Sequence, residues 1–341
     1  MPSSINSPLR PGPRWLAAAS LRWRGVLLCV VIALAATFLA RVHGGPQLLY
    51  ALLFGIGFHF LADHALTGPG VDFCARVLLR AGVALLGARI TLEQIAALGW
   101  PTAVLVASAV LATLAFGVLL ARGLRLGTLA GVLSGGATAI CGASAALALA
   151  AVLPRTREAE RLTLVVVLSV TALSTLAMLF YPLLARSLQL SPAQAGVFLG
   201  ATIHDVAQVV GAGYSMSPAI GDHATVVKLL RVSLLALVVV GVGTAMRSGA
   251  EPGAARPPLL PGFMLLFLAF VALHSAGAIP RAWESPLNEL SRACLVVAIA
   301  ALGVRTSFET LVAAGWRCFA LLLGETLWLA AWVLLGLRFL G

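Results

Sequence analysis

The sequence predicts an all-α polytopic membrane protein with about 9–11 transmembrane segments, and three observations lead to that fold class. The chain of 341 residues is 60% hydrophobic and only 10% charged, with a mean hydropathy of +1.02, whereas a soluble domain carries about 25% charged residues. Many apolar runs reach the roughly 20 residues that a bilayer-spanning helix needs. Ten-residue runs of alternating polarity, typical of outer-membrane strands, are missing from the sequence.

The apolar runs are separated by short joints that carry glycine, proline and charge. Residues 1–22 are polar and rich in proline, serine and arginine, so we expect a disordered cytoplasmic tail there. Residues 23–341 form a single transmembrane domain. Its eleven segments lie at about 23–40, 46–62, 71–89, 100–121, 127–153, 161–184, 193–213, 223–246, 260–279, 286–304 and 316–338.

Two stretches of the chain match at a constant offset of 216 residues. LLGARITLEQIAALGW (85–100) aligns with ALGVRTSFETLVAAGW (301–316), and the residue types that are rare in this chain match in order. The equivalent segments are seven apart, an odd number, so the two copies are predicted to have opposite orientations. This inverted-topology repeat is an organisation of many secondary transporters. The repeat blocks, about 23–121 and 223–338, flank a central stretch with the broken helices at about 127–213.

The net charge of +11 does not indicate nucleic-acid binding. The 23 basic residues are spread between apolar segments without a basic stripe, as in the cytoplasmic loops of membrane proteins. Counting these charges favours a cytoplasmic N-terminus. Arg155, Arg157 and Arg161 then lie on the cytoplasmic side only if segment 5 is broken or re-entrant, and segment 7 is expected to behave alike.

Segment 5 contains SGGATAICGASAA (134–146), an unusually polar and glycine-rich stretch for a membrane helix. Irregular backbone survives at membrane depth only where it is buried in protein or lines a cavity. A half-helix beginning near Cys141 would direct free N–H groups at one point and form an anion site. Tight helix packing through small residues is the alternative. The candidate substrate-binding residues here are Gly135, Gly136, Thr138, Cys141, Gly142 and Ser144.

Segment 7 contains GATIHDVAQVVGAG (200–213), where His204, Asp205 and Gln208 interrupt an apolar run. Ionisable groups inside membranes are costly and usually functional. His204 and Gln208, four residues apart, are expected on one helical face as substrate contacts, with Asp205 as a coupling-ion site. The alternative is a short segment whose polar residues are solvated at the interface.

Three charged residues lie further along the chain. Lys228 and Arg231 share a helical face in segment 8, where they either face the cavity and bind an anion or extend towards the membrane surface. On the first interpretation, neutral replacements abolish transport and leave folding intact. Glu325, alone in segment 11, is a second candidate for the coupling ion.

Together, the two polar motifs and the VVKLLR stretch resemble the YeiH-type UPF0324 family of bacterial inner-membrane proteins, over nearly the whole chain from about residue 25. The resemblance implies a multi-pass inner-membrane protein that exports sulfate. The family motifs fall on Gly135, Gly136, Thr138, Cys141 and Gly142, on His204, Gln208 and Gly211, and on the basic pair Lys228 and Arg231. Ala143 stands where a further glycine is expected.

We therefore expect a secondary transporter of a small anion, sulfate or a related sulfonate or organic anion, coupled to H⁺ or Na⁺. The sequence lacks a phosphate-binding loop, a nucleophile elbow and an HExxH motif, so an enzyme is not predicted, nor is a bound cofactor or metal. The expected partners are an anionic solute and the lipid bilayer, with a homodimer left open and no nucleic acid. A cation/proton antiporter on the same scaffold, and a non-transporting sensor or complex subunit, are the alternatives.

Overall fold

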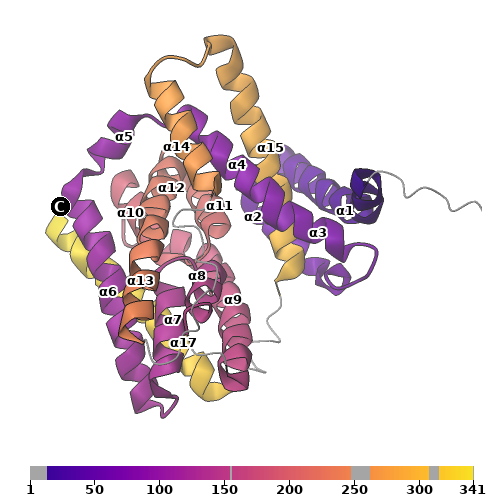
Figure 1. Ribbon diagram of the computed structural model, residues 1–341. Helices are drawn as coiled ribbons and strands as arrows, with labels where there is room; N and C mark the ends of the chain where they lie inside the picture. The colour runs from indigo at the N-terminus through magenta and orange to yellow at the C-terminus, as the bar shows by residue number, and fades with distance from the viewer. Residues whose placement is uncertain (1–13, 154–155, 247–261, 307–314, 341) are drawn as a thin grey trace, which may run out of the picture.

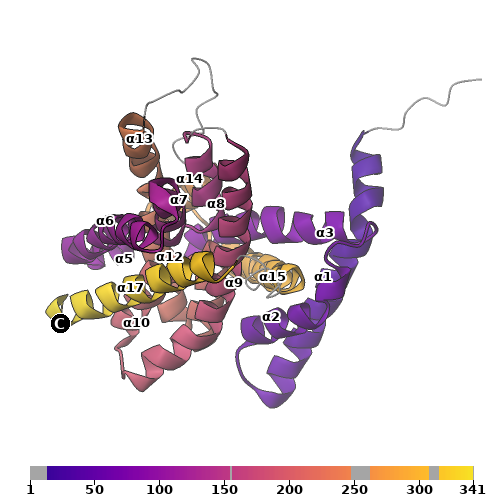
Figure 2. The same ribbon diagram turned by 90° about the horizontal axis from the view of Figure 1, so that it is seen from below.

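The computed structural model describes residues 14–153, 156–246, 262–306 and 315–340. Within these ranges every regular element is a helix, which confirms the all-α fold class. Figures 1 and 2 show two groups of helices beside each other, and the first group is built from an early and a late part of the chain.

The first group, here called the panel, contains the N-terminal helices and two later ones. Its members pack on one another, α2 and α4 against α15 above all. In Figures 1 and 2, α1, α2 and α3 lie at one side of the molecule. The panel consists of α1 (Arg14–His43), α2 (Gln47–Gly57), η1 (His59–Leu61), α3 (Gly68–Phe73), the π-helix η2 (Cys74–Leu78), α4 (Leu79–Leu86), η3 (Gly87–Arg89), α14 (Gly262–Ser275) and α15 (Arg281–Arg305).

The second group, here called the core, contains the middle of the chain and its last helix. The short helix α5 (Leu92–Ala97) leads into it from the panel. The core meets the panel mainly where α11 packs against α2 and α15. It consists of α6 (Gly99–Gly123), α7 (Gly127–Ala139), α8 (Ala143–Ala150), α9 (Arg157–Ser187), α10 (Pro192–Thr202), α11 (Val206–Met216), α12 (Pro218–Ser233), α13 (Leu235–Ala245) and α17 (Trp316–Leu340).

Six helical stretches among the described residues are long and apolar enough to cross a membrane. They coincide with six of the eleven predicted segments, and the other five segments are short or interrupted helices. Large apolar side chains such as Leu34 and Phe38 are more than half exposed on α1, as expected of a surface solvated by lipid.

The structure bears on two expectations from the sequence, the disordered tail and the internal repeat. Residues 14–22 belong to helix α1, so the predicted tail to residue 22 is wrong over that part, and residues 1–13 lie outside the described ranges. The helix α6 at 99–123 and the helix α17 at 316–340 obey the 216-residue offset to within one residue. Glu309, the repeat partner of Glu93, lies outside the described residues, and the inverted symmetry stays a prediction.

Local sequence explains where the core helices begin. Ser191 and Gln194 form a capping box in which the serine hydroxyl accepts the Gln194 N–H and the glutamine side chain accepts the Ser191 N–H. Pro192 at the first turn needs no donor there. Such caps satisfy backbone groups that a helix end leaves free, and they fix the residue at which α10 begins.

Candidate functional site

Two interrupted helices meet in the centre of the core. Helix α7 ends at Ala139 and α8 begins at Ala143, while α10 ends at Thr202 and α11 begins at Val206. This confirms the predicted breaks in segments 5 and 7. His204, in the second break, lies against Thr138 beside the first break, with its Nδ1 3.1 Å from the Thr138 carbonyl oxygen. We call this meeting point the crossing (Figure 1).

The glycines of segment 5 divide between two roles. Gly142 has φ +64° and ψ −125°, a backbone region that only glycine adopts without strain, and its N–H closes the end of α7 on the Ala137 carbonyl at 2.8 Å. Gly135 and Gly136 instead lie inside α7. A Cβ on Gly135 would meet the backbone of Leu114 on α6, 3.3 Å away. The close approach at Gly135 favours the tight-packing interpretation for that residue, and the positive φ of the break lies at Gly142.

Replacing Gly142 by alanine is expected to destabilise the protein by about 1–3 kcal/mol, because an L-residue is strained at this φ and ψ. The matched control is Gly241→Ala in α13. No atom beyond the adjoining backbone lies within 4 Å of a Cβ built there, and alanine is the better helix former. Thermal melting of the purified protein in detergent checks this, and equal melting temperatures for Gly142→Ala and the wild type would contradict it.

Lys228 is fully buried and its ammonium group contacts the carbonyl ends of both half-helices. Its Nζ donates to the carbonyl oxygens of Ile140 at 2.6 Å, Ile203 at 3.0 Å and His204 at 2.5 Å. Carbonyls at a helix C-terminus have no partner within the helix and carry the negative end of its dipole. All three lysine donors are thus engaged with backbone.

Arg231 contacts the same two helix ends from one turn further along α12. It is 1% exposed, and its guanidinium donates to the carbonyls of Thr138 and Ala139 and, at 3.1 Å, of Ile203. The sequence predicts that Lys228 and Arg231 either face a cavity or extend to the surface, and the structure shows neither arrangement. Both cations neutralise the carbonyl ends of α7 and α10.

Glu325 is the residue through which α17 contacts the crossing. The carboxyl group is fully buried, with Oε1 2.6 Å from the Ser134 hydroxyl and Oε2 3.1 Å from the Thr138 hydroxyl. The Ser134 hydroxyl also lies 2.8 Å from the Ala130 carbonyl oxygen. A serine hydroxyl has one proton. It donates either to an ionised Glu325 or to Ala130, and in the second case a protonated Glu325 donates to it.

His204 also has a neighbouring hydroxyl group that can serve both protonation states of its side chain. Its Nδ1 faces a carbonyl, which only accepts, so Nδ1 carries a proton. Its Nε2 lies 3.0 Å from the hydroxyl of Thr326, which itself lies 2.7 Å from the Leu322 carbonyl. The neutral ring accepts the Thr326 proton, and a charged ring donates to Thr326 while Thr326 donates to Leu322. The crossing accommodates both states of both residues by turning one hydroxyl each.

Two predicted site residues lie apart from this network. Gln208 does not share a helical face with His204, because the break separates them, and its Nε2 donates to Thr175 of α9 at 2.8 Å. Asp205 caps α11, with Oδ1 accepting the Ala207 N–H at 2.8 Å. An acidic residue at a helix N-terminus interacts favourably with the helix dipole, which supplies a structural reason for Asp205.

The N-terminus of α8 lacks such a cap. Gly142 precedes it and supplies no side chain to accept the first N–H groups. Cys141 is buried in the break, whereas Ser144 in the first turn is exposed. Of the predicted anion-binding features, the first turn of α8 at Ser144 is the one that reaches the molecular surface, whereas Gly142 is buried with its N–H bonded to Ala137.

Sequence reasoning had left out Ser134 and Thr326 as site residues. Ser134 lay inside the polar motif, one turn before Thr138, and that spacing places both hydroxyls on one helical face. Thr326 directly follows Glu325, and this position next to a candidate coupling residue could have identified it as a site residue. The tertiary contact of α17 with α7 brings both residues into the hydrogen-bond network of the crossing.

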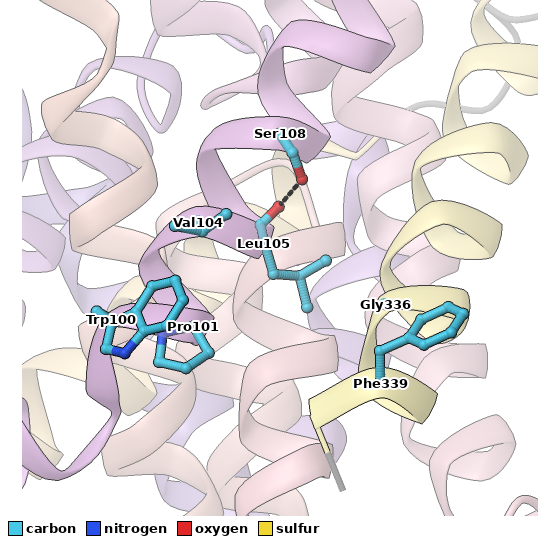
Figure 3. Close-up of a pocket in the computed structure, with 7 residues that line it drawn as sticks. All are labelled: Trp100, Pro101, Val104, Leu105, Ser108, Gly336 and Phe339. Carbon is cyan, nitrogen blue, oxygen red and sulfur yellow. Dashed lines mark hydrogen bonds between the residues drawn. The ribbon is translucent and has the colours of Figure 1, made fainter.

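A wide apolar hollow of about 500 Å³ lies away from the crossing, between α6 and α17. Figure 3 shows Trp100 at its edge and Phe339 opposite. The hydroxyl of Ser108 donates to the Leu105 carbonyl at 2.9 Å and accepts from Trp332. Because Ser108 is already satisfied, this hollow suits lipid rather than a polar solute.

Comparisons with known proteins agree with this helical architecture. Residues 24–322 match the family model described as Conserved hypothetical protein 698. The chain is similar to a UPF0324 membrane protein of Chlorobaculum tepidum, 49% identical over 91% of this chain and 87% of the relative. It is also similar to the UPF0324 membrane protein TauZ of Paracoccus denitrificans, 48% identical over 93% of this chain and 95% of the relative. No solved structure matches.

Proposed function

The chain belongs to the UPF0324 family of multi-pass membrane proteins, and from this premise and the crossing we propose that it is a proton-coupled secondary transporter. Its substrate is a small oxyanion such as sulfate or a sulfonate, exported across the bacterial inner membrane, with the N-terminus in the cytoplasm. The observation that carries the proposal is the meeting of two broken helices at buried, hydrogen-bonded Glu325 and His204. Transporters of unrelated sequence place their substrate and coupling ion at such discontinuous helices.

The choice of the proton over sodium depends on which groups already contact the carbonyl oxygens at the ends of α7 and α10. Half-helix C-termini and unwound carbonyls coordinate Na⁺ in several transporters, but here Lys228 and Arg231 donate to these oxygens. A sodium ion would have to displace two fixed cations. Glu325 and His204 each have a neighbouring hydroxyl that serves both protonation states, so the proton is the coupling ion that these residues support.

The anion is assigned to the uncapped start of α8. Free N–H groups at a helix N-terminus and the positive end of its dipole bind oxyanions, and Lys228 and Arg231 supply positive charge behind the break. The cation/proton antiporter is less well supported, because its ion would need the carbonyls that these two residues engage. We interpret the closed crossing, where Lys228, His204 and Glu325 are fully buried, as an occluded state between the two access states.

Radiolabelled sulfate flux in proteoliposomes tests the function. An imposed proton gradient is expected to drive saturable flux, a sodium gradient to have no effect, and sulfonates to compete. Sodium-driven proton movement without sulfate flux would instead establish the antiporter. If neither sulfate nor any competing anion crosses under either gradient, the transporter proposal is wrong and the sensor alternative gains.

A further inference from the structure

A small polar hollow of about 200 Å³ lies where the panel meets the core, away from the crossing. Arg89, at the end of η3, lines it from the panel side, and Gln94 of α5 lies at its edge. Asp222 and His223 line it from α12 of the core. Because the hollow has walls from both groups of helices, any ligand in it senses their relative position.

An ion pair crosses this hollow and connects the panel to the core. Arg89 Nη2 lies 3.0 Å from Asp222 Oδ2, and Tyr214 donates to Asp222 Oδ1 at 2.5 Å. The Arg89 guanidinium also stands 5.5 Å from the centre of the Tyr214 ring. The described residues contain one other ion pair, between Arg305 and Asp72, and it lies within the panel. Arg89–Asp222 is thus the ion pair of the described chain that joins the panel to the core.

Within the described residues, the hollow leaves N–H donors of Arg89 unused and one ring nitrogen of His223 without a partner. Arginine has five N–H donors, of which one contacts Asp222, and the Arg89 side chain is 31% exposed. His223 Nδ1 has no hydrogen-bond partner among the described residues. Both oxygens of Asp222 are engaged, one by Arg89 and one by Tyr214. A ligand that accepts hydrogen bonds and carries negative charge would use the remaining donors of Arg89.

We propose that this hollow is a binding site for a small oxyanion, and that the anion releases the core from the panel by taking Arg89 from Asp222. A planar guanidinium binds sulfate, sulfonate or carboxylate oxygens through two parallel hydrogen bonds. Tyr214 holds Asp222 in place while Arg89 turns to the anion. The anion's identity as the transported substrate depends on the proposed function, whereas its binding to Arg89 does not.

The direction in which the anion shifts the conformational equilibrium follows from its competition with Asp222 for Arg89. In the connected state the Asp222 carboxylate already neutralises Arg89, so an oxyanion binds the disconnected state more tightly. A ligand shifts a conformational equilibrium only through such a difference in affinity. Sulfate therefore favours separation of η3 from α12, which is the movement that rocking of one body against the other requires.

The test measures sulfate binding to the purified protein in nanodiscs, together with hydrogen exchange in peptides covering residues 86–95 and 214–226. For the wild type, sulfate is expected to increase exchange in both peptides. In Arg89→Gln this response is lost, and the sulfate concentration needed for it rises about 10- to 100-fold if any response remains. Asp222→Asn is expected to bind sulfate at a several-fold lower concentration, because its competing charge is gone, and to show raised exchange in both peptides before sulfate is added.

Arg305→Gln is the matched control, since Arg305 is the repeat partner of Arg89 and its ion pair joins two panel elements. It should respond to sulfate as the wild type does. The opposite sign expected for Asp222→Asn protects the test from misfolded variants, which lose binding whichever residue is changed. An unchanged response in Arg89→Gln, or weaker sulfate binding by Asp222→Asn, overturns the proposal.

The same variants separate this site from the proposed function. Arg89-dependent sulfate binding in a protein that moves no anion in proteoliposomes would leave the site standing and remove the transporter. Sulfate flux that is unchanged in Arg89→Gln, with no Arg89-dependent exchange response, would leave the transporter standing and remove the site.

Discussion

Replacing Lys228 by methionine is expected to destabilise the folded protein by about 2–6 kcal/mol. The substitution leaves the carbonyls of Ile140 and His204 without their Nζ donor, while Ile203 keeps its contact with Arg231. Each buried group left unpaired costs about 1–3 kcal/mol. Methionine removes the cost of burying a charge, but the carbonyls that the charge satisfied remain at the ends of α7 and α10. The unpaired carbonyls therefore dominate.

The measurement is thermal unfolding in detergent, read as loss of monodisperse protein with temperature. Arg80→Met is the matched control, because Arg80 is an exposed cation of α4 for which the structure shows no hydrogen bond among the described residues. That variant is expected to melt like the wild type. A Lys228→Met protein as stable as Arg80→Met would mean that the carbonyl contacts contribute little.

This outcome differs from the expectation drawn from the sequence, where neutral replacement of Lys228 leaves folding intact and abolishes only transport. The spacing in the sequence predicted that Lys228 and Arg231 share a helical face, but not that this face is buried in protein. It could not show which atoms face that helix, because the carbonyls of Thr138, Ala139 and Ile140 come from a segment about 90 residues earlier. A transport assay on this variant must therefore be normalised to folded protein.

Much of the fold could be predicted because hydropathy and local chemistry determine it. The eleven apolar segments follow from composition, and the break at Gly142 follows from a glycine between two helical runs of small residues. The panel and the core could not be predicted, since they depend on which helices pack together. Likewise, Arg89 was visible as a repeat residue, but its partner Asp222 lies 133 positions away.

The candidate site was predicted in its residue types more than in its contacts. Glu325 looked isolated in an apolar helix, and only the packing of α17 on α7 brings it to Ser134 and Thr138. His204 and Gln208 looked like one face of a helix, and an extended backbone at Asp205 separates them. Sequence spacing predicts neighbours within one helix, and it fails where a helix stops.

The buried carboxyl of Glu325 leads to the second large effect, on energy coupling rather than on stability. In Glu325→Gln the side-chain amide can donate to Ser134 while its carbonyl oxygen accepts from Thr138, which reproduces the hydrogen bonds of a protonated Glu325. Both hydroxyls stay satisfied, so we expect normal folding. Sulfate exchange between the two sides of the membrane needs no change in protonation and should continue.

Proton-driven accumulation of sulfate should be lost in the same variant, because the residue that takes up and releases the proton no longer titrates. In proteoliposomes with an imposed proton gradient, the expected ratio of internal to external sulfate falls to unity, while counterflow persists at close to the wild-type rate. The matched control is Glu289→Gln, which removes one exposed carboxylate from α15 and should accumulate sulfate normally. Continued accumulation in Glu325→Gln would move the coupling proton to His204 or Asp205, and loss of counterflow as well would show that Glu325 is needed for the movement itself.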